Sequence, residues 1–207
     1  MKQILCFGDS NTYGLIPATT ERYEFGARWT GKLDEKVRGK GYRIIEEGLC
    51  GRTTVFQDPL REGRRGVDLL PVILETHKPV DTVILMLGTN DCKTVFDASA
   101  EVIGKGVERL LDQIKQVSPD TKVLLVSPIA LGKGIWEEGY DPEFNEVSVR
   151  VSGKLPEVYE RIAQSRGIAF LAASRYAQPD EADREHLDRD GHGKLAEAIA
   201  HKLEEIL

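Results

Sequence analysis

Apolar segments that read as β-strands alternate along this chain with segments of helical periodicity. The two strongest, TVILML (82–87) and KVLLVS (122–127), are almost continuous in Val, Ile and Leu, as in strands buried on both faces of a parallel sheet. Further strands are expected at 4–7, 43–46 and 168–171, and helices at about 28–38, 66–77, 99–117, 143–166 and 191–206. This alternation predicts an α/β fold with a five-stranded parallel sheet, right-handed crossovers and helices on both faces.

The length and charge of the chain limit what it can be. It has 207 residues, a net charge of −6 and no linker-like stretch, so a single domain over residues 1–207 is expected. Because no basic surplus exists to neutralise phosphates, we expect neither a nucleic acid nor a membrane surface as a partner. No apolar run approaches the roughly 20 residues that a membrane-spanning helix needs.

The cysteines and the first residues of the chain favour a cytoplasmic location. Cys6, Cys50 and Cys92 are an odd number without paired spacing, which indicates neither a disulfide framework nor a zinc motif. The first strand begins at residue 2 or 3, and this leaves no room for a signal peptide. A reduced, cytoplasmic protein is therefore expected.

Polar residues follow the predicted strands, at the edge of the sheet where ligands bind in parallel α/β folds. That edge lies outside the carboxyl ends of the strands. The turns there contain GDS (8–10), EGLCGRTT (47–54), GTND (88–91) and DREHL (183–187). Each of these short sequences alone is weak evidence for a functional site. Ser10 by itself reads more readily as a helix cap than as a nucleophile.

Together these turns contain the groups that acyl transfer requires. Ser10 supplies a hydroxyl nucleophile, His186 a base for its proton, and Asp183 a carboxylate for the other ring nitrogen. The N–H groups of Ser10 and Gly51, with the side-chain amide of Asn90, would stabilise an oxyanion.

Other residues compete for two of these roles. Candidate bases besides His186 are His77, His192 and His201, and candidate acids besides Asp183 are Asp180 and Asp188. Asp188 and Asp190 precede or begin the last predicted helix, where a capping role is expected.

The four turns resemble the sequence blocks of the SGNH hydrolases, also called GDSL-type esterases. The blocks occur in the family's order as GDSNTYG, EEGLCGRTT, LGTND and DREHL, between residues 8 and 187. The segments RWTG (28–31), DP (58–59) and VLLVSP (123–128) are similar to the bacterial arylesterase and acyltransferase branch. The resemblance implies a flavodoxin-like three-layer α/β/α sandwich and no metal or other cofactor. It also implies a triad of Ser10, His186 and Asp183, with Ser10, Gly51 and Asn90 as oxyanion donors.

Three positions depart from the pattern of that branch. Tyr13 stands where Trp is usual beside the acyl pocket, Gly51 where Ala is frequent, and Arg184 where many members have Gly. The first departure leaves the acyl preference open. Glycine at position 51 still supplies the backbone N–H for the oxyanion, and arginine at position 184 does not remove the triad.

Several residues near the turns are candidates for binding substrate or for bracing the site. Asp9 and Asp91 are expected to brace their turns through backbone hydrogen bonds. Arg52 could contact a polar substrate or fix the oxyanion loop, and Tyr13 could border the acyl pocket.

Trp136 lies in the loop 127–145, which is rich in Gly and contains Pro. This loop is either a mobile flap over the site or a plain surface loop. Cys50 and Cys92 adjoin the proposed oxyanion residues and are expected to be small, half-buried thiols without a redox role.

The leading hypothesis is a serine esterase that hydrolyses short-chain, acetyl-like esters of aryl, alkyl or sugar alcohols. Acyl transfer and perhydrolysis are possible side activities, and the resemblance implies a homo-oligomer. The alternative is a non-catalytic small-molecule or phosphate-binding domain, because a turn such as GDSNT can cradle a phosphate with its N–H groups. No phosphate- or dinucleotide-binding fingerprint accompanies that turn.

Overall fold

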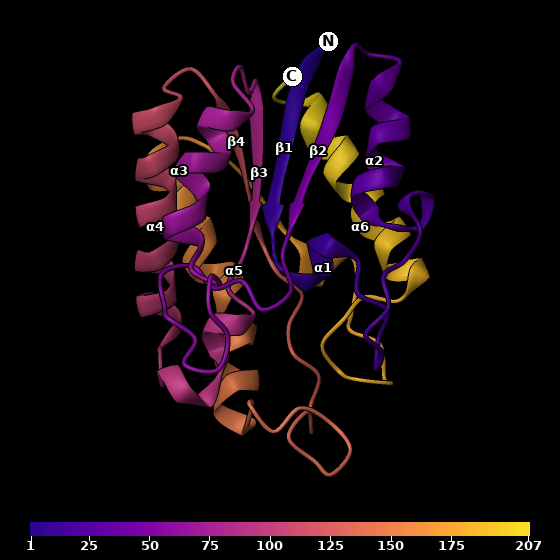
Figure 1. Cartoon of the computed structure of the whole chain (residues 1–207), viewed down its shortest axis with the longest axis vertical. Helices are drawn as coiled ribbons and strands as arrows, with labels where there is room; N and C mark the ends of the chain where they lie inside the picture. The colour runs from indigo at the N-terminus through magenta and orange to yellow at the C-terminus, as the bar shows by residue number, and fades with distance from the viewer.

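The sheet of this protein is five-stranded and entirely parallel (Figure 1). The computed structural model describes residues 1–207. The strand order is β2-β1-β3-β4-β5. The strands are β1 (Lys2–Gly8), β2 (Tyr42–Gly48), β3 (Thr82–Met86), β4 (Lys122–Ser127) and β5 (Ala169–Ala172).

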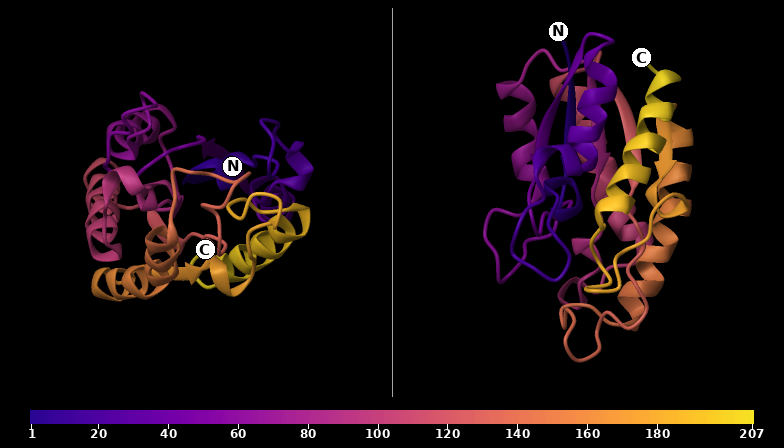
Figure 2. Two further views of the ribbon diagram at one scale, coloured as in Figure 1. Left: turned by 90° about the horizontal axis from the view of Figure 1, so that it is seen from below. Right: turned by 90° about the vertical axis from the view of Figure 1, so that its right-hand side faces the viewer.

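Helices cover both faces of the sheet. The short helix α1 (Ser10–Tyr13) follows the carboxyl end of β1. The longer helices are α2 (Trp29–Arg38), α3 (Gly66–Thr76), α4 (Ala100–Val117), α5 (Glu146–Arg166) and α6 (Arg189–Glu204). Viewed from below, α3, α4 and α5 lie on one side and α2 and α6 on the other (Figure 2). The structure confirms the predicted three-layer α/β/α sandwich.

The alternation of side chains along β1 creates two separate cores. Leu5 and Phe7 pack with α3, α4 and α5, whereas Ile4 and Cys6 pack with α2 and α6. Successive residues of a strand point to opposite faces of the sheet. Because helices cover both faces here, all four side chains are fully buried. An apolar run without polar interruption is therefore what a central strand of this sandwich needs.

The predicted strands and helices are all present, with small differences at their ends. The largest difference is at α5, which begins at Glu146 rather than 143, because Asn145 and Ser148 form a capping box there. The strand β2 is two residues longer than predicted at its carboxyl end. The missed residues are Glu47 and Gly48, which lack the apolar character of a typical strand; both are half-buried in the edge strand of the sheet.

The strands point toward the end of the molecule that carries the candidate site. Both termini lie at the opposite end (Figures 1 and 2). Gly8 at the end of β1 is paired with Gly48 of β2 and with Met86 of β3. The turns after these three strands therefore begin side by side.

The loop 127–145 is anchored to the body rather than free. Ile129, Leu131, Ile135 and Phe144 are buried in the cores. Its exposed residues are Lys133, residues 136–139 and Pro142. Of the two readings of this loop, the plain surface loop describes its packing better. No helix of the protein is both long and apolar enough to cross a membrane.

Candidate active site

Ser10 begins a single helical turn directly after the central strand β1. Asp9 caps this turn, since its carboxylate Oδ1 accepts a hydrogen bond of 3.0 Å from the Asn11 N–H. Close approach to β2 requires glycine at position 48, where a Cβ would lie 2.1 Å from the Tyr13 nitrogen. The glycine at that position thus lets α1 lie directly on the end of the neighbouring strand.

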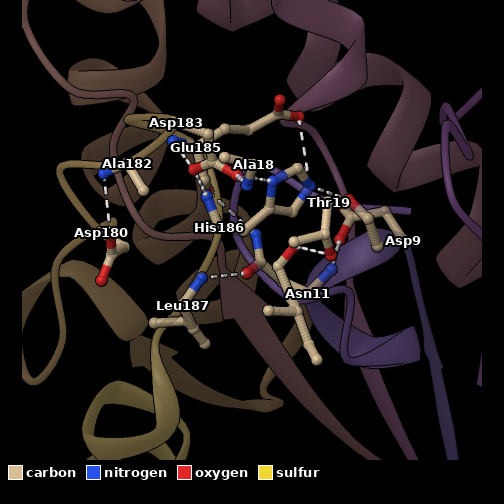
Figure 3. Close-up of polar contacts among 12 residues, drawn as sticks. Asp9, Asn11, Ala18, Thr19, Asp180, Ala182, Asp183, Glu185, His186 and Leu187 are labelled. Carbon is tan, nitrogen blue, oxygen red and sulfur yellow. Dashed lines mark hydrogen bonds and ion pairs between the residues drawn. The ribbon is translucent and has the colours of Figure 1, made fainter. Parts of the chain in front are cut away.

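The structure brings Ser10, His186 and Asp183 into one hydrogen-bonded chain. The Ser10 Oγ lies 2.9 Å from His186 Nε2, and His186 Nδ1 lies 2.7 Å from Asp183 Oδ2. The Asp183 carboxylate also accepts hydrogen bonds of 2.9 Å from the N–H groups of Ala18, Glu185 and His186 (Figure 3). These bonds fix the acid, which in turn fixes the imidazole beside the hydroxyl.

Asn11 holds the histidine loop against the serine turn. Its Oδ1 accepts a hydrogen bond of 2.9 Å from the Leu187 N–H, and its amide donates one of 3.3 Å to the Glu185 carbonyl. The indole N–H of Trp29 donates to the Asn11 carbonyl at 3.1 Å. The sequence suggests only a helical residue at position 11. The role of Asn11 depends on partners more than 170 positions away, which no local pattern reveals.

The proposed oxyanion donors come from the two strands that flank β1. Gly51 follows β2 and has a φ of +82°, a left-handed conformation that glycine adopts without strain. Asn90 follows β3 and is 3% exposed, and its amide donates a hydrogen bond of 3.2 Å to the Arg52 carbonyl. The loop of Gly51 and the loop of Asn90 are therefore joined by a direct hydrogen bond.

Two buried charged side chains stabilise these loops. Arg52 donates to the carbonyls of Gly8, at 2.9 Å, and of Glu47, and its guanidinium lies 4.0 Å from the centre of the Phe7 ring. With 3% of the residue exposed, Arg52 fits a role in fixing the oxyanion loop and not in contacting the substrate. Asp91 accepts from the Thr54 N–H at 2.9 Å and so ties the two loops together.

Burial and hydrogen bonding separate the pKa values of the acid and the base. Burial raises the pKa of Asp183, but its hydrogen bonds with His186 and with two backbone N–H groups outweigh burial and lower it to about 2. Burial lowers the pKa of His186, whereas the carboxylates of Glu185 and Asp183 outweigh this effect and raise it to about 9. Burial also raises the pKa of Asp9, to about 6.

Glu185 is a site residue that the sequence analysis did not identify. It is 8% exposed, and its Oε1 lies 3.8 Å from Nε2 of His186. Burial raises the pKa of this carboxyl to about 7. A glutamate in the sequence EH reads as an ordinary surface residue, so only the fold reveals its position.

None of the competing histidines and aspartates makes a hydrogen bond with the Ser10 hydroxyl or the His186 imidazole. His192 is fully buried and accepts a hydrogen bond of 3.2 Å from the Trp29 N–H, and burial lowers its pKa to about 4. His77 contacts Glu47, and His201 is exposed on α6. Asp188, not Asp190, is the N-cap of α6. Asp180 accepts from the Ala182 N–H at 2.7 Å, as a turn residue does.

The remaining candidate residues have structural surroundings of their own. The Tyr13 ring is half-buried under the Arg22 guanidinium, 4.3 Å from its centre. Trp136 is 36% exposed in the loop 127–145, without a polar contact to the triad. Cys50 is half-buried and Cys92 is buried, and burial raises the pKa of both thiols. No group of three or more His, Cys, Asp and Glu side chains could hold a metal ion.

The arrangement contains what nucleophilic acyl transfer needs. It has a hydroxyl, a base within hydrogen-bond distance of it, and an ionised acid on the other side of the base. Donors on the loops of Gly51 and Asn90 flank the same strand end. The phosphate-binding alternative explains none of the contacts among Ser10, His186 and Asp183.

Comparisons with known proteins agree with this chemistry. A sequence model described as the GDSL-like Lipase/Acylhydrolase family matches residues 6–201. A search of curated proteins finds no match. The structure of Est24, a carbohydrate acetylesterase from Sinorhizobium meliloti, is similar with 36% sequence identity and a TM-score of 0.92, covering 100% of both chains.

Two further solved structures are similar to this chain. The aryl esterase of M. smegmatis has 34% identity and a TM-score of 0.92, covering 100% of both chains. The lipase/acylhydrolase of Enterococcus faecalis has 17% identity and a TM-score of 0.70 over 99% of this chain and 96% of its own, which shows the shared fold alone. The chain therefore belongs to the GDSL-like lipase/acylhydrolase family, the SGNH hydrolases, and is a carboxylester hydrolase.

Proposed function

We propose that this enzyme hydrolyses short-chain, acetyl-like esters of aryl, alkyl or sugar alcohols through an acyl-enzyme on Ser10. The observation that carries the proposal is the chain of contacts from the Ser10 hydroxyl through His186 to Asp183, at 2.9 and 2.7 Å. The similar structures of a carbohydrate acetylesterase and of an aryl esterase support the acetyl group and the sugar and aryl alcohols.

In the proposed mechanism Ser10 Oγ attacks the ester carbonyl while Nε2 of His186 takes the hydroxyl proton. The negative charge that develops on the carbonyl oxygen is stabilised by the N–H groups of Ser10 and Gly51 and by the Asn90 amide. Each such donor contributes roughly 10²–10³ to the rate. The imidazolium of His186 then protonates the leaving alcohol, and Asp183 stabilises the imidazolium until that proton is transferred.

Deacylation repeats these steps with a second nucleophile. Water gives hydrolysis, an alcohol gives acyl transfer, and hydrogen peroxide gives perhydrolysis, each with His186 as the base. The latter two are proposed as side activities. A homo-oligomeric state and a cytoplasmic location remain predictions.

The nucleophile is tested with the Ser10→Ala variant and p-nitrophenyl acetate. We expect the variant to keep the wild-type circular dichroism spectrum and to lose at least 99.9% of the esterase rate, in the range known for triad residues. The matched control is Ser165→Ala, which removes an exposed hydroxyl on α5 and should leave the rate unchanged.

A fluorophosphonate probe followed by peptide mass spectrometry provides a second test. The phosphonyl group should be found on Ser10 alone. A wild-type protein that binds p-nitrophenyl acetate without turnover and forms no adduct would instead be a binding domain. A Ser10→Ala variant with more than a few per cent of the rate would place the nucleophile elsewhere.

A further inference from the structure

Glu185 brings a second carboxylate to the reacting face of the catalytic histidine. Oε1 of Glu185 lies 3.8 Å from Nε2 of His186, the nitrogen that contacts the Ser10 hydroxyl. In Figure 3 the Glu185 side chain extends past the imidazole to this nitrogen, whereas Asp183 meets the ring at Nδ1. Asp183 orients the base, and the proposed mechanism leaves Glu185 without a task.

The main chain at Glu185 is fixed on both sides. Its N–H donates to Asp183 Oδ1 at 2.9 Å, and its carbonyl accepts from the Asn11 amide at 3.3 Å. The side chain therefore starts from a rigid point within the catalytic loop.

No protein group neutralises the Glu185 carboxylate except the catalytic histidine. The adjacent Arg184 points elsewhere, since its guanidinium pairs with Glu137 at 2.7 Å and lies over the Tyr140 ring. The only ion pair of the Glu185 side chain is with His186, and the nearby carboxylates of Asp141, Asp183 and Asp9 raise its pKa rather than neutralise it. All the hydrogen bonds of Glu185 involve its main chain.

A buried carboxylate without hydrogen-bond donors needs them from outside the protein. Burial of such a group costs several kcal/mol unless donors compensate. In the free enzyme water can supply them, and in the complex only the substrate can. The unoccupied acceptor lies at the place where the leaving alcohol must approach Nε2 of His186.

We propose that Glu185 selects esters whose alcohol carries a hydroxyl on the carbon next to the ester-bearing carbon, as in acylated sugars and other polyols. The leaving oxygen must come within hydrogen-bond distance of His186 Nε2, and Glu185 Oε1 lies 3.8 Å from that nitrogen. A hydroxyl one carbon further along the alcohol can then donate to the carboxylate. The inference rests on the proposed esterase activity and narrows its substrate class.

A hydroxyl fits this site better than a cationic group does. The Glu185 carboxyl has a pKa of about 7, so it is partly protonated near neutral pH. A carboxyl and a hydroxyl form a hydrogen bond in either protonation state, whereas a cation needs the ionised form. The developing imidazolium of His186 also competes with a substrate cation for the same charge.

The test compares 2-hydroxyethyl acetate with propyl acetate, which replaces the hydroxyl by a methyl group of similar size. The quantity measured is the ratio of kcat/KM for the two esters, determined by pH-stat titration. Effects of Glu185 that act through His186 change both rates equally and cancel in this ratio. We expect the wild-type ratio to exceed one and the Glu185→Leu variant to lower it at least ten-fold.

Two further variants make the result specific to the acceptor at position 185. Glu185→Gln keeps a carbonyl oxygen and should retain most of the ratio. Glu181→Leu removes an exposed glutamate of the same loop and should leave the ratio unchanged. If Glu185→Leu fails to fold, Glu185→Ala takes its place, and its kcat/KM ratio for the two esters is compared with that of the wild type.

The possible outcomes separate this inference from the proposed esterase function. A ratio of one or less in the wild type, or the same ratio in all variants, would overturn the role of Glu185 while esterase activity remains. A loss confined to acetylcholine as a third substrate would overturn it in favour of a cation site. A wild-type protein that hydrolyses neither these esters nor p-nitrophenyl acetate would refute both proposals.

Discussion

Asn11 stands next to the proposed nucleophile Ser10, and its hydrogen bonds give it a positioning role in the proposed mechanism. Its side-chain amide group binds the main chain of residues 185 and 187, the two neighbours of the proposed base His186, with hydrogen bonds of 3.3 and 2.9 Å. A triad assembled from distant parts of the chain depends on such a clamp, because displacement of a catalytic group by about 1 Å can cost 10²-fold in rate.

The Asn11→Ala variant should therefore lower kcat for p-nitrophenyl acetate by roughly 10²-fold, with a smaller change in KM. The Asn11→Asp variant keeps the acceptor for the Leu187 N–H but loses the donor to Glu185, so its kcat should be intermediate. Stopped-flow and steady-state rates measure both effects. Wild-type kcat in Asn11→Ala would show that the histidine loop holds its position without this clamp.

The two carboxylates beside His186 also determine the pH at which the base becomes neutral. Their charges raise its pKa from 6.5 to about 9, and a raised pKa shifts the neutral, active form to higher pH. We expect kcat/KM to rise with pH well above 6.5. In Glu185→Gln, which removes one negative charge, the midpoint should lie at a lower pH.

This shift is measured from the pH dependence of kcat/KM between about pH 5 and 10, corrected for spontaneous hydrolysis. Glu181→Gln, a change in an exposed side chain of the same loop, serves as the charge-matched control and should keep the wild-type midpoint. An identical midpoint in Glu185→Gln and the wild type would mean that Glu185 has no electrostatic effect on the base.

At the scale of the secondary-structure elements, one buried lysine joins three of the loops that surround the site. Lys93 is 3% exposed and pairs with Asp58, at 3.0 Å, and with Glu143, at 2.9 Å. Asp58 belongs to the loop after β2 and Glu143 to the loop after β4. The ion pairs thus connect the oxyanion loops with the anchored loop 127–145.

Replacing Lys93 with methionine should lower the free energy of unfolding by about 3–5 kcal/mol, because the buried Asp58 would lose its partner. Urea denaturation measures this change. Lys105→Met, in an exposed position of α4, is the control and should change stability by less than about 0.5 kcal/mol. A loss of similar size in both variants would indicate that the ion pairs contribute nothing.

The sequence predicts some of these elements better than others for a physical reason. The central strands β3 and β4 are buried on both faces, and this burial requires the uninterrupted apolar runs that make them recognisable. The edge strand β2 ends with Glu47 and Gly48, which continue no apolar run, so only residues 43–46 are apparent in the sequence. Asn11 and Glu185 gain their roles from tertiary contacts across the whole chain, which no spacing in the sequence encodes.

At the scale of the whole molecule, several buried carboxyl groups lie close together at the carboxyl end of the sheet. Burial raises the pKa of Asp9 and of Asp91 from 3.8 to about 6, and that of Glu185 from 4.5 to about 7. The folded state then binds more protons than the unfolded state over roughly pH 4–7, so stability decreases as pH rises through this range. Two groups act in the opposite direction: ionised Asp183 as pH falls toward about 2, and buried His192, whose pKa of about 4 lies below 6.5, between about pH 4 and 6.5. They are outnumbered by the raised acids and by His186.

His186 extends the same trend to alkaline pH. Its folded pKa of about 9 lies above 6.5, so its contribution to stability is complete below pH 6.5 and is lost as pH rises through 9. We therefore expect the Tm to be at least about 5 °C higher at pH 5 than at pH 9. The esterase rate should have the opposite pH dependence, since the base must be neutral.

Differential scanning calorimetry at pH 5 and pH 9 measures the difference in Tm, and a Tm that is equal or higher at pH 9 would contradict the expectation. The Glu185→Gln variant should show a smaller difference, because it lacks one of the acids that cause it.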